Sequence, residues 1–316
     1  MVNVDAGGGD RLALAVLVQY RMATTQQLHL LTAPGVRIEQ TRRRLGELRS
    51  EGLVDHITLA QAGRTRVWFA TGYGVRIASA WPELRDQPRR HAADRTAVRL
   101  KAGHGLTVTE VGLAFVQDAR HRGETCRPLD WIAEVHHPLG GSEAVIADAL
   151  LYYRRGDADH GSGGAMLRAF VEVDRATMGP ERLAAKIGAY ARLHRYVPAP
   201  ARRRRQPFTQ QATEEAWKQH YPLFPRLLFI LDGTGPAGIE HRVRALHAAA
   251  TDTALYGFPH EVPILTAALA DLLREGPSAP VWRPALAPDQ RVSWMHTGRL
   301  HCPSPPTGPP TVRIPG

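Results

Sequence analysis

The spacing of apolar and polar residues over the first seventy positions predicts three helices followed by a β-hairpin. The expected helices cover 10–20, 25–31 and 38–51, and the expected hairpin strands cover 53–60 and 66–70. Apolar residues recur at helical spacing in the first three stretches, whereas the last two are rich in β-favouring residues and are joined by a polar turn. Three helices and a hairpin in this order are typical of a winged helix-turn-helix.

In a winged helix-turn-helix, the third helix lies in the DNA major groove and the hairpin touches phosphate or the minor groove. The predicted third helix carries a run of arginines, and the predicted hairpin has an arginine at its tip. The candidate DNA contacts are Thr41, Arg42, Arg43, Arg44 and Arg64. Two other interpretations stay open, because a charge run often only solvates one helix face and winged helices also bind proteins.

A second pattern, in which helices and strands alternate, follows a Pro-containing stretch. The expected order is a helix, three strands, a helix and a further strand, at 107–122, 129–136, 145–151, 169–174, around 183–193 and at 227–231. A polar Gly-rich loop, 154–165, separates the second and third strands. The chain is therefore expected to be a mixed α/β (α+β) protein.

Two of these apolar strands contain acidic residues, namely Asp148, Glu172 and Asp174. A carboxylate in such a strand costs several kcal/mol to desolvate unless a cation, a metal ion or a hydrogen-bond donor compensates it. Glu172 and Asp174 point to the same face because side chains alternate along a strand, and Asp148 joins them if the strands are neighbours. These carboxylates predict a site for Mg²⁺ or Mn²⁺. The alternative is a set of ion pairs with Arg175, Arg182 or Lys186.

With its acids at 148 and 172, this order of elements resembles the PD-(D/E)XK nuclease superfamily over roughly 104–232. The resemblance implies a restriction-endonuclease-like αβββαβ core in which Asp148 and Glu172 bind metal and a lysine activates water. Asp174 stands at the superfamily's lysine position, and Lys186 on the following helix can serve instead. The resemblance thus names Asp148, Glu172, Asp174 and Lys186 as catalytic candidates. It makes Glu110 a weaker one, for which capping the first helix is the simpler role.

More specifically, three features resemble the replication-relaxation family: the predicted winged helix, His-Gly-Leu-Thr-Val at 104–108, and Glu-Val-Asp-Arg-x-Thr-Met at 172–178. Members of that family are associated with plasmids and mobile elements. The resemblance implies a DNA-binding replication-relaxation or mobilisation protein, with Mg²⁺-dependent nickase or endonuclease activity implied by the nuclease-like core.

Other functions stay open. One is a non-catalytic DNA-binding factor for replication or transfer whose nuclease fold is degenerate, and another is a regulator whose second domain senses a ligand. A rolling-circle mechanism would need a histidine pair and a tyrosine nucleophile from Tyr152, Tyr153 or Tyr190. His136 and His137 are adjacent, so they point to opposite faces of a strand and disfavour it.

The charge balance points to a polyanionic partner. The 316 residues include 40 Lys and Arg against 30 Asp and Glu, a net charge of +10. Such an excess favours nucleic acid, because basic side chains that neutralise phosphates release counterions. A second basic stretch at 202–205 adds Arg203 and Arg204 as candidate DNA contacts, with an ordinary solvated loop as the alternative. A homodimer and accessory replication or transfer proteins are compatible with this interpretation.

The remaining composition bounds the architecture and the compartment. No apolar run approaches the roughly 20 residues of a membrane span, and the N-terminus is no signal peptide, so a cytoplasmic protein without a membrane partner is expected. Two cysteines support neither a disulfide framework nor a zinc site. The expected units are a disordered segment 1–9, a winged helix 10–80, a linker 81–103, a nuclease-like domain 104–275 and a disordered Pro-rich tail 276–316.

Overall fold

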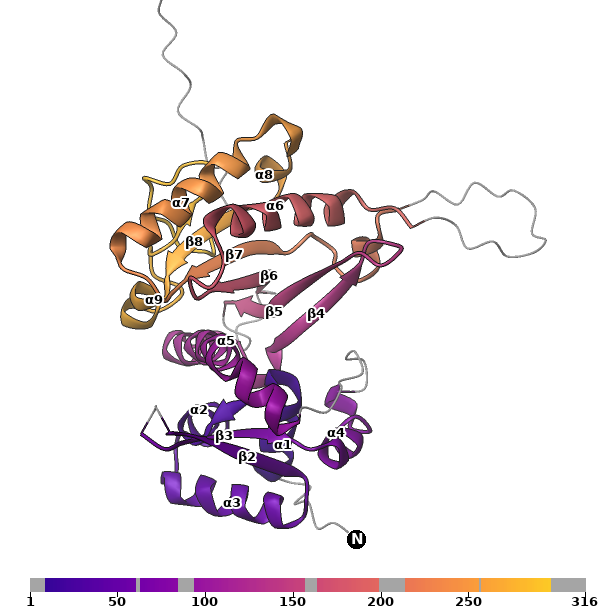
Figure 1. The fold of residues 1–316 in the computed structure, drawn as a ribbon, viewed down its shortest axis with the longest axis vertical. Helices are drawn as coiled ribbons and strands as arrows, with labels where there is room; N and C mark the ends of the chain where they lie inside the picture. The colour runs from indigo at the N-terminus through magenta and orange to yellow at the C-terminus, as the bar shows by residue number, and fades with distance from the viewer. Residues whose placement is uncertain are drawn as a thin grey trace, which may run out of the picture.

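The computed structural model describes residues 9–60, 63–84, 94–156, 164–198, 214–255 and 257–296. These residues form a mixed α/β fold with one three-stranded and one six-stranded sheet (Figure 1). The prediction of a mixed α/β protein is therefore confirmed. Within these ranges, no helix has the length and apolar character needed to cross a bilayer.

The N-terminal elements surround the smaller sheet. They are α1 (Gly9–Tyr20), β1 (Ala23–Thr24), α2 (Thr25–Thr32), α3 (Ile38–Ser50), β2 (Val54–Leu59), β3 (Thr65–Ala70) and α4 (Gly72–Ala78). The sheet order is β1-β3-β2, with both pairings antiparallel. Thr24 begins α2 through a reciprocal capping box with Gln27, which satisfies backbone N–H groups at the helix start. Strand β1 is the one element of this unit that the sequence pattern did not indicate.

Helix α5 (Arg95–Arg122) is 28 residues long and starts twelve residues before the expected position. The side chain of Asp94 caps it by accepting a hydrogen bond from the backbone N–H of Ala97 at 2.7 Å. The first half of this helix contains two glycines, and because glycine often marks the end of a helix, the sequence suggested a helix boundary there. One of them, Gly105, lies against Met22, where a Cβ would come within 2.7 Å of the sulfur. Residues 95–103 are thus helical, although they were expected to belong to a linker.

The larger sheet has the order β4-β5-β6-β7-β8-β9. Its strands are β4 (Trp131–Pro138), β5 (Ala144–Arg155), β6 (Ala165–Asp174), β7 (Arg226–Leu231), β8 (Ile264–Ala268) and β9 (Arg283–Pro284). The pairs β4–β5, β5–β6 and β8–β9 are antiparallel, whereas β6–β7 and β7–β8 are parallel. Helices α6 (Pro180–Arg195) and α7 (Pro236–Ala250) cover one face, and α5 lies on the other, next to the N-terminal elements (Figure 1).

Each face of this sheet has its own buried cluster. Phe170 and Phe229 pack with Ile187 of α6 on one face. On the other face, a single cluster continues from Leu17 of α1 through Phe115 of α5. The N-terminal elements and the larger sheet therefore share buried side chains, while the division into two domains stays a prediction.

The expected disordered tail is wrong over residues 276–296, which are described and packed. The side chains of Trp282 and Trp294 are fully buried, and β9 pairs with β8. The indole of Trp282 donates a hydrogen bond to the carbonyl of Pro277 at 2.7 Å. Because burial of a large aromatic side chain favours folding, these tryptophans outweigh the proline content that indicated disorder.

Candidate functional site

Asp148 and Glu172 lie on the neighbouring strands β5 and β6, at the point where the pairing of these strands ends. The last paired residues of the ladder are Ala149 and Val171. Beyond them, Oδ2 of Asp148 accepts a hydrogen bond from the backbone N–H of Val173 at 2.8 Å. A carboxylate side chain thus replaces a ladder hydrogen bond where the strands separate, and this fork holds both acids.

Glu172 is buried at this fork, with 1% of its surface exposed. Its Oε2 contacts the ammonium of Lys186 on α6, and its Oε1 accepts a hydrogen bond from the hydroxyl of Tyr190 at 2.6 Å. Burial raises the pKa of Glu172 to about 7, against the lowering influence of Lys186. Glu172 is therefore a carboxyl group that can exchange a proton near neutral pH.

Lys186 is the cation of this pair. Burial alone would lower the pKa of Lys186, but the carboxylates of Glu172 and Asp148 raise it above its ordinary value. Lys186 therefore carries its charge at neutral pH. Of the ion-pair partners that the sequence suggested as an alternative to metal binding, this lysine is the one that contacts Glu172.

His104 of α5 contacts the other acid of the fork. Its Nε2 lies 3.1 Å from Oδ1 of Asp148, and this hydrogen bond raises the pKa of His104. Burial opposes ionisation of Asp148, but His104 and Lys186 hold the pKa of Asp148 below its ordinary value. Sequence reasoning used His104 only as part of a motif and gave it no role. Helix α5 and strand β5 are far apart in the chain, so sequence spacing could not indicate this pairing. The sequence feature that pointed to His104 was the motif at 104–108.

Asp174 faces a different partner. It is buried, and its Oδ2 accepts a hydrogen bond from Nε of Arg242 on α7 at 2.6 Å, while Oδ1 accepts one from the backbone N–H of Ala176 at 3.1 Å. Arg242 was not among the partners suggested by the sequence. Both oxygens of Asp174 are thus engaged in holding the turn after β6, so its predicted role as a metal ligand stays a prediction without support from this geometry.

The donor set can be compared with what a divalent cation needs. In the part of the chain that the structure describes, no group of three or more His, Cys, Asp or Glu side chains is placed to hold a metal ion. Asp148 and Glu172 supply two carboxylates, and Mg²⁺ often takes only one or two from a protein while water and substrate phosphate complete its shell. All four carboxylate oxygens of Asp148 and Glu172 already have partners, in His104, Val173, Lys186 and Tyr190, so magnesium binding at the fork stays a prediction that requires exchange of these contacts.

Arg175 adds a cation beside the fork. Its guanidinium lies over Gly103 of α5, where a Cβ would come within 2.3 Å of Nη1. Its Nε has no hydrogen-bond partner within the described residues, and it is 3.9 Å from the carboxylate of Asp232. The positive charge of Arg175 also opposes protonation of the nearby His104. The guanidinium thus adds positive charge near His104, while its Nε is buried.

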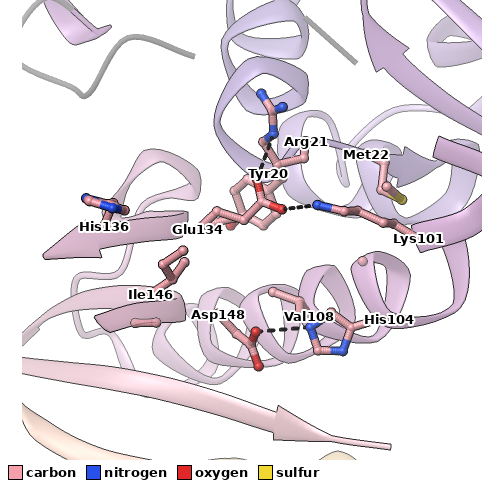
Figure 2. A pocket seen from close by; sticks show the side chains of 13 residues that line it. Tyr20, Arg21, Met22, Lys101, His104, Val108, Glu134, His136, Ile146 and Asp148 are labelled. Carbon is pink, nitrogen blue, oxygen red and sulfur yellow. Dashed lines mark hydrogen bonds and ion pairs between the residues drawn. The ribbon is translucent and has the colours of Figure 1, made fainter. Parts of the chain in front are cut away.

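A cavity of ≈ 730 Å³ opens at the same place. It lies between the end of α1, the first half of α5 and strands β4 and β5, and Asp148 forms part of its wall (Figure 2). Figure 2 also shows Glu134 between Arg21 and Lys101, facing the cavity. Asp148 is therefore reachable from solvent through this cavity.

The candidate DNA contacts on α3 are not equivalent. Arg42 and Arg43 are exposed and pair with Glu39 and Glu47 of their own helix. Thr41 is 1% exposed, and its hydroxyl lies 2.9 Å from Nδ1 of His29, so its assignment as a DNA contact is corrected. The reason is helical geometry, which turns position 41 inward with Leu45 and Leu48.

The other arginines predicted to contact DNA differ in their surroundings. Arg44 contacts the carboxylate of Asp10 at the start of α1 and thus links two helices. Arg64 lies in the turn between β2 and β3 with a positive φ of 60° and is exposed. Arg203 and Arg204 lie outside the described residues.

Residues considered for other mechanisms are accounted for by packing. Glu110 accepts a hydrogen bond from Gln27 at 2.7 Å and links α5 to α2. His136 is exposed and His137 is buried beside Tyr221, as their adjacency predicted. Tyr153 donates a hydrogen bond to Glu124 at 2.6 Å and is buried.

The chain was compared with known proteins and protein families. A family model described as replication-relaxation matches residues 14–206, which is more than half of the 316 residues. The match includes the N-terminal elements, α5, the fork between β5 and β6, and Lys186. The searches of curated proteins and of solved structures gave no match.

Proposed function

Because the chain belongs to the replication-relaxation family, we propose that it binds plasmid or mobile-element DNA and cuts one strand in a reaction that depends on a divalent cation. Family membership makes it a replication- or mobilisation-related protein. The finer proposal rests on one observation, the contact of Lys186 with Glu172 beside Asp148 at the fork of β5 and β6. A lysine and two acids at such a fork are the groups that metal-dependent phosphodiester hydrolysis requires.

In this proposal the two acids have different roles. Asp148 and Glu172 would hold Mg²⁺ or Mn²⁺, which when bound polarises the scissile phosphate and makes water a stronger nucleophile. Asp148 is kept ionised by His104, whereas Glu172, whose pKa burial raises to about 7 in the free protein, would lose its proton on holding the ion. Water adds to phosphorus and releases a proton to bulk water, the bond between phosphorus and the leaving oxygen breaks, and that oxygen takes a proton from bulk water.

Two cations would stabilise the reacting phosphate. Lys186 stays protonated, so it offsets the charge that develops on the phosphate oxygens and orients water as a donor instead of removing a proton from it. The guanidinium of Arg175 adds positive charge near His104 and would attract a phosphate group to the fork. Neither role needs the lysine at position 174, where this chain has an aspartate.

The N-terminal elements would supply the DNA contact. Their order and the β1-β3-β2 sheet support a winged-helix module, with α3 in the major groove and Arg64 at the tip of the hairpin. Exposed Arg42 and Arg43 and the net charge of +10 support a phosphate-rich partner. A homodimer and accessory replication proteins belong to this proposal as further partners.

A second candidate is a non-catalytic DNA-binding factor that uses the same fold as a platform. The observation in its favour is that each acid of the fork region has a cationic partner: Asp148 has His104, Glu172 has Lys186 and Asp174 has Arg242. Such pairing is sufficient to retain buried acids without any metal.

The two candidates differ in a cleavage experiment with supercoiled plasmid DNA and purified full-length protein. Nicking is expected with Mg²⁺ or Mn²⁺ and not with EDTA, and Glu172→Gln and Lys186→Ala are expected to lower its rate at least 100-fold. Lys218→Ala is the matched control, since Lys218 pairs with Glu215 away from the fork. Salt-sensitive DNA binding without nicking by the wild-type protein would instead identify the non-catalytic factor.

A further inference from the structure

The cavity beside Asp148 has a charge pattern that suits a phosphate group. Nε of Arg21 lies 3.3 Å from one oxygen of Glu134, and Nζ of Lys101 lies 3.2 Å from the other. Two cations therefore share one carboxylate, which gives this part of the wall one excess positive charge, while Asp148 adds a carboxylate elsewhere in the cavity. Lys101 is 68% exposed, so its ion pair is screened by water and can be exchanged for a phosphate.

The backbone directs this cluster into the cavity. Glu134 has φ of 52° and Arg21 has φ of 74°, both in the left-handed region that non-glycine residues rarely adopt. On either side of Glu134, Ala133 and Val135 pair normally with β5. The strand is thus distorted at one residue, whose carboxylate lines the cavity. Conformations of this kind are retained at binding sites more often than elsewhere.

Another part of the wall is apolar. Met22, Val108, Ala133 and Ile146 contribute side chains to it. Ile146 is 55% exposed and therefore offers apolar surface to an occupant of the cavity. An apolar wall next to two cations is complementary to a nucleotide, which has a flat base and an anionic phosphate.

The size of the cavity limits the occupant. Its volume of ≈ 730 Å³ lies within the range of about 300–1,000 Å³ that accommodates single small molecules. It therefore has room for a nucleotide and not for a double helix. Asp148 lies in the same wall, so a nucleotide bound here would place a neighbouring phosphate at the fork of β5 and β6.

We propose that this cavity receives one unpaired nucleotide of the DNA strand, with its base against Ile146 and Met22 and its phosphate on Lys101 and Arg21. The proposal rests on the proposed function and specifies its substrate class, DNA that is locally unpaired at the cutting site. Glu134 holds the two cations in the free protein and gives them up to the phosphate.

The test is equilibrium binding of full-length protein, in EDTA, to three fluorescent 30-nucleotide DNAs: a perfect duplex, the same duplex with a central three-nucleotide bubble, and the single strand. The wild type is expected to bind the bubble about tenfold more tightly than the perfect duplex. Lys101→Ala is expected to remove most of that preference and to change duplex affinity less than twofold. The matched control Lys218→Ala removes the same charge elsewhere and is expected to keep the preference.

Glu134→Gln is expected to change the affinity for the bubble DNA in the opposite direction. It frees Arg21 and Lys101 from their shared carboxylate, so affinity for the bubble is expected to rise several-fold while duplex affinity stays unchanged. A merely structural role of Glu134 would produce a loss instead.

Equal affinity for bubble and duplex, or equal effects of Lys101→Ala and Lys218→Ala, would overturn the proposal. Strong competition by a free deoxynucleoside monophosphate would also overturn it, in favour of a site for a free nucleotide. Because EDTA prevents cleavage, a bubble preference in a protein that never nicks DNA would support the cavity and reject the nuclease. Nicking without this preference would do the reverse.

Discussion

The ammonium of Lys186 on α6 contacts Oε2 of Glu172 on β6, fourteen residues earlier in the chain. The helix thus brings to the acid the positive charge that its own strand does not supply, because position 174 is an aspartate. The contact leaves Asp174 to a separate ion pair with Arg242. Two buried acids on one strand face therefore have different partners and different expected properties.

The stability of the protein is expected to depend on pH through Glu172. A carboxyl group whose pKa is higher in the folded protein than in the unfolded chain favours folding at low pH, and this contribution is lost as the pH rises through the folded value. For Glu172 the interval runs from its ordinary 4.5 to about 7. Since one pKa unit corresponds to about 1.4 kcal/mol, the loss is at most about 3.5 kcal/mol.

Urea unfolding of the wild type and of Glu172→Gln across this interval measures that contribution. The free energy of unfolding of the wild type is expected to fall relative to that of the variant as the pH rises. Parallel curves for the two proteins would contradict the buried, proton-binding state of Glu172.

The buried pair of Asp174 and Arg242 is expected to be sensitive to removal of one partner. Arg242→Ala leaves an uncompensated carboxylate that is 1% exposed, so we expect a loss of about 3–5 kcal/mol in the free energy of unfolding. The double variant Asp174→Leu/Arg242→Met removes both charges and should recover most of the loss. Denaturant unfolding of the wild type and the two variants is the measurement, and a double variant no more stable than Arg242→Ala would argue against a coupled pair.

The segment after residue 276 is expected to contribute to the core. Trp294→Ala should cost about 3–5 kcal/mol, because Trp294 is fully buried against Phe115 and Tyr153. Leu223→Ala is a suitable control, since Leu223 is 77% exposed and should change stability by less than about 0.5 kcal/mol. Thermal or urea unfolding distinguishes the two variants. Equal stability of both variants would support the prediction that this segment is disordered.

DNA affinity is expected to separate the exposed from the buried positions of α3. Arg42→Ala/Arg43→Ala should weaken binding to duplex DNA and reduce its salt dependence by about one unit of slope for each lost phosphate contact. Thr41→Val should lower stability through the lost contact with His29 and leave the affinity of the folded protein unchanged. Fluorescence anisotropy at several salt concentrations tests both, and an affinity loss confined to Thr41→Val would contradict the orientation of the helix.

Several features of this protein follow from the sequence alone. The helices and hairpin before residue 71 and the strands that carry Asp148 and Glu172 were predictable because helical and strand periodicities are local properties of the chain. The alternation of side chains also placed Glu172 and Asp174 on one face, away from Val171 and Val173. The motifs at 104–108 and 172–178 indicated the family.

Other features depend on contacts between distant parts of the chain. His104 meets Asp148 across 44 residues, and Arg242 meets Asp174 across 68 residues. Helix α5 has two glycines at the positions where Arg175 and Met22 occupy the space that a Cβ would fill. The burial of Trp282 and Trp294 likewise requires the completed sheet.

Local periodicity therefore determined the helices and hairpin before residue 71, the strands that carry Asp148 and Glu172, and the shared face of Glu172 and Asp174. The identity of each acid's partner, the inward position of Thr41 and the cavity beside Asp148 were decided by the tertiary structure. The physical reason is that a buried charge is stabilised by the donor that the packed elements bring within hydrogen-bond distance. The spacing of residues in the sequence does not determine that distance.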